Sequence, residues 1–194
     1  MIIDFEGMDG TGKTTVAVEI ARILNFEFVQ KPMRMLFDRG QEDVTAKILA
    51  ITNEIDDKNF GALFLGSVQY YQSKTIQNKN VVLDRYLSSN YYHHSNESNI
   101  KYFDCLVELC EKPDLTIVLY ASSEERKKRI MDRNGSDVDL SRFEDNDLPY
   151  EKIKSFLERY NMPYMWLDST KMTKEEVVER VIERVNDMKI DKRP

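Results

Sequence analysis

Short apolar runs alternate along the chain with longer stretches in which apolar residues recur at helical spacing. The apolar runs have the length and composition of buried strands, and they cover residues 2–6, 26–29, 81–84, 115–119 and 164–167. The stretches with helical spacing cover residues 16–24, 42–55, 60–77, 100–111, 122–133, 150–160 and 173–188. Strands that alternate with helices are typical of a parallel sheet. We therefore expect an α/β fold: a doubly wound, five-stranded parallel sheet with helices on both faces.

Length, composition and charge indicate a single domain and argue against binding to duplex nucleic acid or to a membrane. The 194 residues are 41% hydrophobic and 32% charged, which suits one core, so we expect a single domain over residues 1–194. The net charge of −6 argues against a surface for duplex nucleic acid, because such a surface needs an excess of Lys and Arg. No apolar run approaches the length of a membrane span, and the first strand begins without a charged leader. We expect no membrane anchor.

The two cysteines, Cys105 and Cys110, lie five positions apart in one predicted helix and so point in different directions. This spacing predicts neither a disulfide framework nor a pair of metal ligands. A reduced, cytoplasmic setting is expected.

The turn after the first strand has the residues of a phosphate-binding loop. Gly7 is followed after four residues by Gly12, Lys13 and Thr14, between a strand and a helix, which is the P-loop pattern in its required context. Glycines let the backbone N–H groups curl around phosphate oxygens at the positive end of a helix. Lys13 is expected at the β- and γ-phosphates and Thr14 at Mg²⁺. The predicted ATP-binding residues are Gly7, Met8, Asp9, Gly10, Thr11, Gly12, Lys13, Thr14 and Thr15.

Other polar residues follow neighbouring strands of the predicted sheet. Arg34 is expected in a loop after the second strand, and Asp84 and Arg85 end and follow the third. In parallel sheets ligands lie beyond the carboxyl ends of the strands. These side chains should therefore gather with the P-loop at one edge.

P-loops occur in several classes of protein, and further residues distinguish them. A GTPase would carry the base-recognition motif Asn-Lys-x-Asp, but the nearest match, residues 78–81, lacks the aspartate. A motor ATPase would have Glu after its acidic strand residue, whereas Arg85 follows Asp84. A small-molecule kinase fits better, because it needs several arginines around clustered phosphates and a lid that excludes water. The arginines expected in such a lid, at about residues 126–144, are Arg129, Arg133 and Arg142.

Three segments resemble the thymidylate kinase family, which phosphorylates dTMP with ATP and Mg²⁺. They are residues 5–15 (FEGMDGTGKTT), residues 84–89 (DRYLSS) and the Arg-Phe-Glu of residues 142–144. The combination is fairly specific to that family and the related deoxynucleoside kinases. Members are usually homodimers that pack through helices, so we expect a homodimer here.

The resemblance implies roles for individual residues. Asp9 would hold the deoxyribose 3′-hydroxyl, Arg34 and Arg85 would grip the acceptor phosphate, and Phe64 would stack on the base. No arginine lies between Gly7 and Gly12, which implies that the catalytic arginine comes from the lid. The implied catalytic residues are Lys13, Arg85, Arg129, Arg133 and Arg142. The implied substrate-binding residues are Asp9, Arg34, Phe64, Arg85, Ser89 and His93, and the implied metal-site residues are Thr14 and Asp84.

Two departures from the family pattern leave the acceptor open. Val68 stands where the family has a base-reading arginine, and His93 stands where it usually has Tyr or Phe beside the sugar 2′ position. Gln69, Gln72 or a water would then have to donate to the base. The acceptor is most simply dTMP, with another deoxynucleoside monophosphate or a nucleoside as alternatives. A further alternative is a regulatory protein that binds ATP without catalysis.

Overall fold

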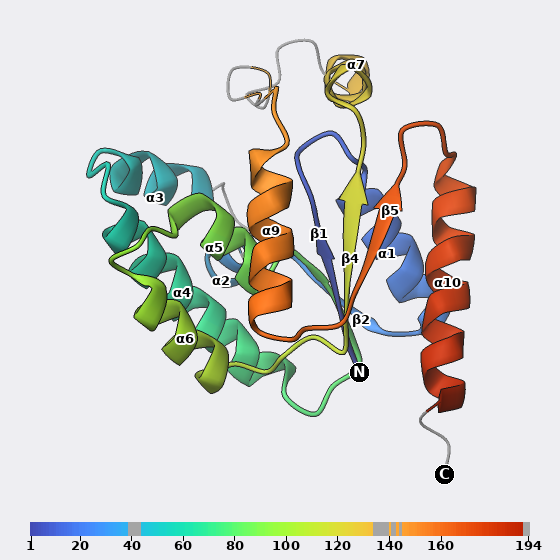
Figure 1. Ribbon diagram of the computed structural model, residues 1–194, viewed down its shortest axis with the longest axis horizontal. Coiled ribbons are helices and arrows are strands. Elements are labelled where there is room, and N and C mark those ends of the chain that lie inside the picture. The colour runs from blue at the N-terminus through green and yellow to red at the C-terminus, as the bar shows by residue number, and fades with distance from the viewer. Residues whose placement is uncertain (39–43, 134–139, 141–142, 144, 192–194) are drawn as a thin grey trace.

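A five-stranded parallel sheet forms the centre of the computed structural model, which describes residues 1–38, 44–133, 140, 143 and 145–191 (Figure 1). The strands are β1 (Ile2–Glu6), β2 (Glu27–Val29), β3 (Val81–Asp84), β4 (Leu115–Tyr120) and β5 (Tyr164–Asp168). They pair in parallel in the order β2-β3-β1-β4-β5. The predicted strands and the predicted parallel sheet are confirmed.

Helices pack on both faces of this sheet (Figure 1). One face is covered by α1 (Lys13–Leu24) and α10 (Lys174–Asp191). The other face is covered by α4 (Lys58–Ile76), α5 (Leu87–His94), α6 (Ile100–Leu109) and α9 (Leu148–Arg159). The described residues also form α2 (Pro32–Phe37), α3 (Val44–Asn53) and α7 (Ser123–Arg133). The predicted doubly wound α/β class is confirmed.

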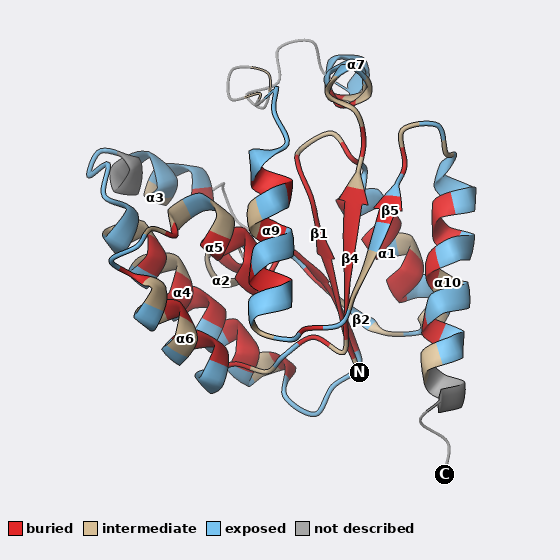
Figure 2. Ribbon diagram, in the orientation of Figure 1, coloured by how far each residue is buried: buried red, intermediate tan, exposed pale blue. Residues whose placement is uncertain are grey.

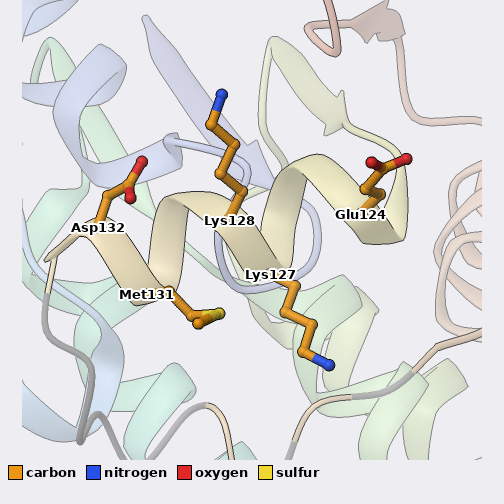
Figure 3. Close-up of a pocket in the computed structure, with 5 residues that line it drawn as sticks. All are labelled: Glu124, Lys127, Lys128, Met131 and Asp132. Carbon is orange, nitrogen blue, oxygen red and sulfur yellow. The ribbon is translucent and has the colours of Figure 1, made fainter.

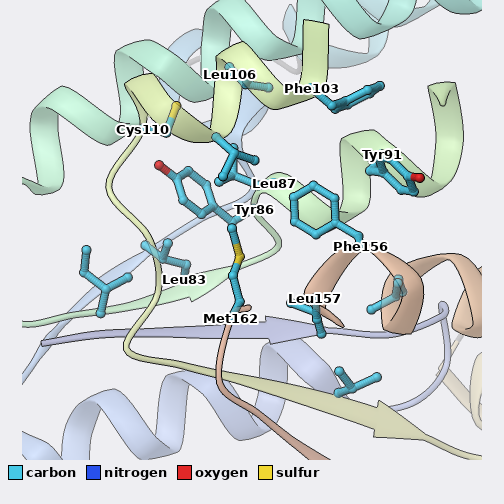
Figure 4. Close-up of a cluster of buried hydrophobic side chains, with 14 of the residues drawn as sticks. Leu83, Tyr86, Leu87, Tyr91, Phe103, Leu106, Cys110, Phe156, Leu157 and Met162 are labelled. Atoms are coloured by element: carbon cyan, nitrogen blue, oxygen red, sulfur yellow. The ribbon is translucent and has the colours of Figure 1, made fainter. Parts of the chain in front are cut away.

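The alternation of side chains along β1 divides the core into two clusters. Ile3 and Phe5 face α1 and α10, whereas Ile2 faces the helices on the other side. Figure 4 shows the second cluster, where Tyr86 and Leu87 meet apolar side chains of α6 and α9. The helices carry both buried and exposed residues (Figure 2). None of the described helices is long and apolar enough to cross a membrane.

Two local expectations were wrong or incomplete. Arg34 lies in α2 and not in a loop, because Pro32 sits at the start of a helix, where its missing N–H is no loss. Helix α5 did not stand out in the sequence, because residues 87–94 are mostly polar and poor helix formers. Its N-terminus is completed instead by a side chain from β1, Glu6. The predicted lid residues 134–139, Arg142 and Glu144 lie outside the described part of the chain.

Candidate active site

The loop between β1 and α1 has the backbone path that its glycines predict. Gly7, Gly10 and Gly12 have φ angles of 136°, 85° and 91°, which side chains disfavour. A Cβ on Gly7 would overlap the carbonyl oxygen of Leu119, and one on Gly10 would lie 2.6 Å from that of Arg126. The loop is therefore pressed against β4 and α7. It leads into the positive N-terminus of α1, where phosphate is favoured.

Lys13 is buried at the base of this loop, with 5% of it exposed. Its Nζ donates to the carbonyl oxygen of Met8 at 2.6 Å and lies 3.9 Å from the Asp9 carboxylate. Thr11 Oγ1 donates to the same carbonyl at 2.9 Å. Burial, and after it the charge of Arg85, lowers the pKa of Lys13 to about 7. A phosphate entering the loop would favour the charged amine and give it a better acceptor than Met8.

Thr14 and Asp84, the two residues expected at Mg²⁺, contact each other. Thr14 Oγ1 donates to Asp84 Oδ2 at 2.7 Å. Asp84 Oδ1 is buried and has no hydrogen-bond partner among the described residues. A hydroxyl beside a buried carboxylate with a spare oxygen is a donor set that suits Mg²⁺, which prefers oxygen ligands.

Arg85 links the end of β3 to the P-loop. Its Nη2 donates to Asp9 Oδ1 at 2.7 Å and its Nη1 to Ser89 Oγ at 3.2 Å. Burial alone would raise the pKa of Asp9, but the charges of Arg85, Lys13 and Lys31 hold it well below its usual range. Asp9 therefore stays anionic between two cations. The Arg85 backbone has a φ of 69°, unusual for a residue with a side chain.

A pocket of about 330 Å³ opens beside the P-loop. Its lining brings together the P-loop, one residue of the segment between β2 and α2, and one side of α7: Asp9, Gly10, Gly12, Lys13, Thr14, Thr15, Lys31, Arg129, Ile130 and Arg133. Two of the three predicted lid arginines therefore line the pocket. The third, Arg142, is not described.

The two described arginines differ in their surroundings. Arg129 Nε pairs with Glu125 at 2.8 Å, and its Nη atoms donate to Thr11 O at 3.3 Å and Ser169 O at 2.8 Å. Arg129 therefore ties α7 to the P-loop and to the segment after β5. Arg133 is exposed at the end of α7 and faces the same pocket.

The other predicted acceptor residues, Arg34, Phe64 and His93, come from three helices, α2, α4 and α5. Arg34 is exposed on α2, and Phe64 is half-buried on α4, stacked on Phe60 with ring centroids 6.0 Å apart. His93 is exposed at the end of α5, and desolvation by the surrounding protein, followed by the charge of Arg85, lowers its pKa. The hydrogen bonds of the Arg85 guanidinium go to Ser89 and Asp9 and not to these three residues. Their roles stay predictions.

The candidate base-reading residues of α4 are buried and engaged with the protein. Gln69 donates to Tyr86 O at 2.6 Å and accepts from Asn90 at 3.0 Å. Gln72 donates to Gln30 O at 3.3 Å, and Val68 is 3% exposed. Gln69 thus holds α4 to the turn that carries Arg85. Its role toward a base stays a prediction.

A second hollow, of about 270 Å³, lies on the outer side of α7 (Figure 3). It is lined by Glu124, Lys127, Lys128, Met131 and Asp132, all from one helix. Side chains from a single exposed helix do not enclose a ligand. The hollow therefore carries no candidate chemistry.

Sequence reasoning missed three residues beside the P-loop. Lys31 lines the pocket, and in the sequence a lysine before a proline indicates only an extended residue. Glu6 accepts hydrogen bonds from the turn after β3; its position directly before the P-loop was the available signal. Tyr150 on α9 accepts from the Met8 N–H at 3.4 Å and donates to Leu119 O at 3.3 Å. Nothing in the sequence signalled this last contact, because it joins residues 142 positions apart.

Comparison with known proteins agrees with the geometry. The thymidylate kinase family model matches residues 5–181. A probable thymidylate kinase of Methanococcus aeolicus is 30% identical to the chain over 200 residues and 97% of each protein is covered. One of Archaeoglobus fulgidus is 30% identical over 205 residues, covering 97% of this chain and 98% of the relative.

Solved structures share the fold. Thymidylate kinase from Ehrlichia chaffeensis has a TM-score of 0.62 at 18% identity, with 96% of this chain and 98% of that chain covered. Deoxyadenosine kinase from M. mycoides has a TM-score of 0.68 at 16% identity, with 96% and 100% covered. At these identities the structural similarity supports the fold and no more specific property. From the family match and the sequence relatives, the chain belongs to the thymidylate kinase family and is a nucleoside monophosphate kinase, a phosphotransferase.

Proposed function

We propose that the protein transfers the γ-phosphoryl group of ATP to dTMP and releases dTDP and ADP. The observation that carries the proposal is the meeting of Lys13 and Arg85 at Asp9, 3.9 Å and 2.7 Å from its carboxylate. A P-loop cation and a cation at the end of the neighbouring strand thereby face one space. Such an arrangement suits two phosphate groups that must approach each other.

Each charged group has a task in this transfer. Arg85 binds and aims the acceptor phosphate, one oxygen of which attacks the γ-phosphorus as the bond to ADP breaks. Lys13 and a lid arginine stabilise the charge that develops on the transferred group, because fixed cations in a dry site do so without reorganising. Asp9, anionic and half-exposed, is suited to accept a hydrogen bond from the sugar 3′-hydroxyl. Arg34 adds charge at the acceptor phosphate, and Phe64, Ser89 and His93 lie on the acceptor side.

Thr14 and Asp84 are the residues that would hold Mg²⁺. When bound, the ion would supply positive charge that offsets the negative charge of the phosphates. The donor set described above supports this assignment. The lid over about residues 126–144, with Arg142, and the single-domain organisation belong to the same proposal.

The protein is further proposed to act as a homodimer in the cytoplasm. Exposed apolar side chains on α4 and α6, among them Leu63 at 55% and Leu109 at 54%, provide a face for a second copy. The described cysteines, Cys105 and Cys110, are both free thiols, as a reducing compartment would keep them.

A coupled assay of ADP release with a panel of nucleosides and monophosphates tests the proposal. We expect turnover with dTMP and little with thymidine, because Arg85 needs a phosphate. Since Val68 cannot donate to a base, at least one other deoxynucleoside monophosphate should react within about a hundredfold of dTMP in kcat/KM. Tight ATP binding without turnover of any acceptor would instead favour a regulatory protein.

The variant Arg85→Lys tests whether Arg85 binds the acceptor phosphate. It keeps the charge but loses the planar fork that reaches Asp9, Ser89 and phosphate together. We expect a rise in the KM for dTMP and a fall in kcat of about tenfold or more, with the dissociation constant of ADP nearly unchanged. Unchanged kinetics with dTMP would place the acceptor phosphate elsewhere.

A further inference from the structure

Arg85 is held in its unusual conformation by two consecutive residues of β1. The Arg85 N–H donates to Phe5 O at 3.0 Å, and the next N–H, of Tyr86, donates to Glu6 Oε1 at 3.0 Å. The two bonds fix both peptide groups around a residue whose φ is 69°. Backbone conformations of this kind persist only where the surroundings enforce them.

Glu6 also acts on the Arg85 side chain through Ser89. Its Oε1 accepts from the Ser89 N–H at 3.1 Å, and its Oε2 accepts from Ser89 Oγ at 2.6 Å. Because the Ser89 hydroxyl gives its hydrogen to Glu6, its lone pairs face Arg85 Nη1, which donates at 3.2 Å. By accepting the hydroxyl hydrogen, Glu6 makes Ser89 Oγ a hydrogen-bond acceptor for the Arg85 guanidinium.

The position of Glu6 keeps it away from the substrates. It is fully buried, with 0% exposed, and it is absent from the lining of the P-loop pocket. It directly precedes Gly7, so the same stretch of backbone begins the P-loop and fixes the acceptor arginine. A buried carboxylate that accepts three hydrogen bonds is costly to remove and hard to replace.

We propose that Glu6, through Ser89 and the turn after β3, is the positioning residue that aims Arg85 at the acceptor phosphate. Glu6 thereby links the geometry of the acceptor site to that of the P-loop. The inference rests on the proposed function, since it takes Arg85 as the acceptor-phosphate ligand.

Two variants test the bond between Glu6 and the Ser89 hydroxyl while the backbone N–H bonds to residue 6 can still form. In Glu6→Gln the carbonyl oxygen can still accept both backbone N–H groups, but the amide becomes a donor toward Ser89 and reverses the hydroxyl. Ser89→Ala leaves the backbone bonds to Glu6 and removes only the hydroxyl. For each we expect the KM for dTMP to rise about tenfold, as for one lost hydrogen bond to a charged group. The dissociation constant of ADP should stay within about twofold.

Asp4→Asn is the matched control. Asp4 is buried two residues earlier on the same face of β1, and its Oδ1 has no hydrogen-bond partner in the described chain. Asp4→Asn keeps the size and shape of the side chain, and burial, followed by the charges of Glu6 and Asp84, raises the pKa of Asp4. We expect unchanged KM for dTMP. An equal rise in this control would assign the effect to the core in general and overturn the proposal.

The experiment needs one measurement that does not depend on substrate. The guanidinium NMR signals of Arg85 in the free protein should be sharp in the wild type and broadened or shifted in both variants. Unmoved signals together with unchanged KM for dTMP in Ser89→Ala would overturn the proposal, even if Glu6→Gln fails to fold. If Arg85→Lys leaves dTMP kinetics unchanged while the signals move as expected, the proposed function fails and the positioning of Arg85 by Glu6 stands.

Discussion

Lys13 is buried, although a lysine side chain is usually solvated. Its ordinary pKa is 10.5, and burial, with Arg85 as the next cause, lowers it to about 7. Above that pH the amine of the free protein is largely neutral. A bound polyphosphate places negative charge against it and raises its pKa again.

Nucleotide binding should therefore take up protons at pH 8. Calorimetry of ADP binding in two buffers of different ionisation enthalpy should report an uptake approaching one proton at pH 8, where the nucleotide itself is fully ionised. Lys79→Met, which removes an exposed lysine paired with Glu27, should leave the uptake unchanged. Binding at pH 8 with no proton uptake would show that Lys13 is already charged in the free protein.

The lowered pKa of Lys13 should also make the folded protein more stable as the pH rises. The unfolded chain keeps a proton on Lys13 up to its ordinary pKa, whereas the folded protein loses it near pH 7. The free energy of unfolding contributed by Lys13 therefore rises with pH between about 7 and 10. Denaturant titrations of Lys13→Met should show a flatter pH dependence over this range than the wild type.

At the scale of elements, α7 combines an anchored beginning with an exposed end. At its beginning the Glu125 N–H donates to Ser122 Oγ at 3.3 Å, which caps the helix. The P-loop packs at Gly10 against the first turn of the helix. Arg129 fastens its middle to Thr11 and Ser169. Arg133 follows one turn later, at the pocket. The two arginines therefore have different tasks.

Their replacement by alanine should separate those tasks. Arg133→Ala should lower kcat by about a hundredfold while the dissociation constant of ADP changes little, as for one lost charge on the transferred group. Arg129→Ala should weaken nucleotide binding and also lower the melting temperature, because it frees three backbone or carboxylate acceptors. Lys127→Ala, on the outer side of the same helix (Figure 3), should leave kcat, ADP binding and the melting temperature unchanged. Loss of ADP affinity with normal kcat in Arg133→Ala would contradict a catalytic role.

At the scale of the whole molecule, α4 and α6 pack against each other beside the sheet (Figure 1), and each carries exposed apolar side chains. Gly66 of α4 lies so close to Tyr102 of α6 that a Cβ would overlap the tyrosine hydroxyl. On the outside, Leu63 and Tyr70 are 55% and 40% exposed, one above the other at a spacing of seven residues. This is the face proposed for the second copy.

Sedimentation equilibrium tests the dimer directly. We expect twice the chain mass of 22.8 kDa for the wild type and a monomer for Leu63→Lys combined with Tyr70→Lys. Val18→Lys, which changes an exposed apolar residue of α1 on the other side of the sheet, should remain a dimer. A monomeric wild type at micromolar concentration would contradict the proposal.

The sequence by itself determined the strands, the parallel sheet and the P-loop, because these depend on local patterns. Period-two and apolar runs define strands, and the glycines of the P-loop need φ angles that few other residues adopt. Once the sheet is parallel, its carboxyl ends must meet at one edge, so the gathering of Lys13, Thr14, Asp84 and Arg85 followed as well.

Only the tertiary structure decided which of the nearby residues serve one another. The helix α5 forms from a polar sequence because Glu6 of another element supplies its N-terminal acceptor. Arg129 and Arg133 look equivalent in the sequence and both line the pocket, yet only the tertiary structure shows that Arg129 also anchors α7 to the segment after β5. Such contacts join residues tens of positions apart, and the energy of a buried hydrogen bond depends on a partner that no local pattern specifies.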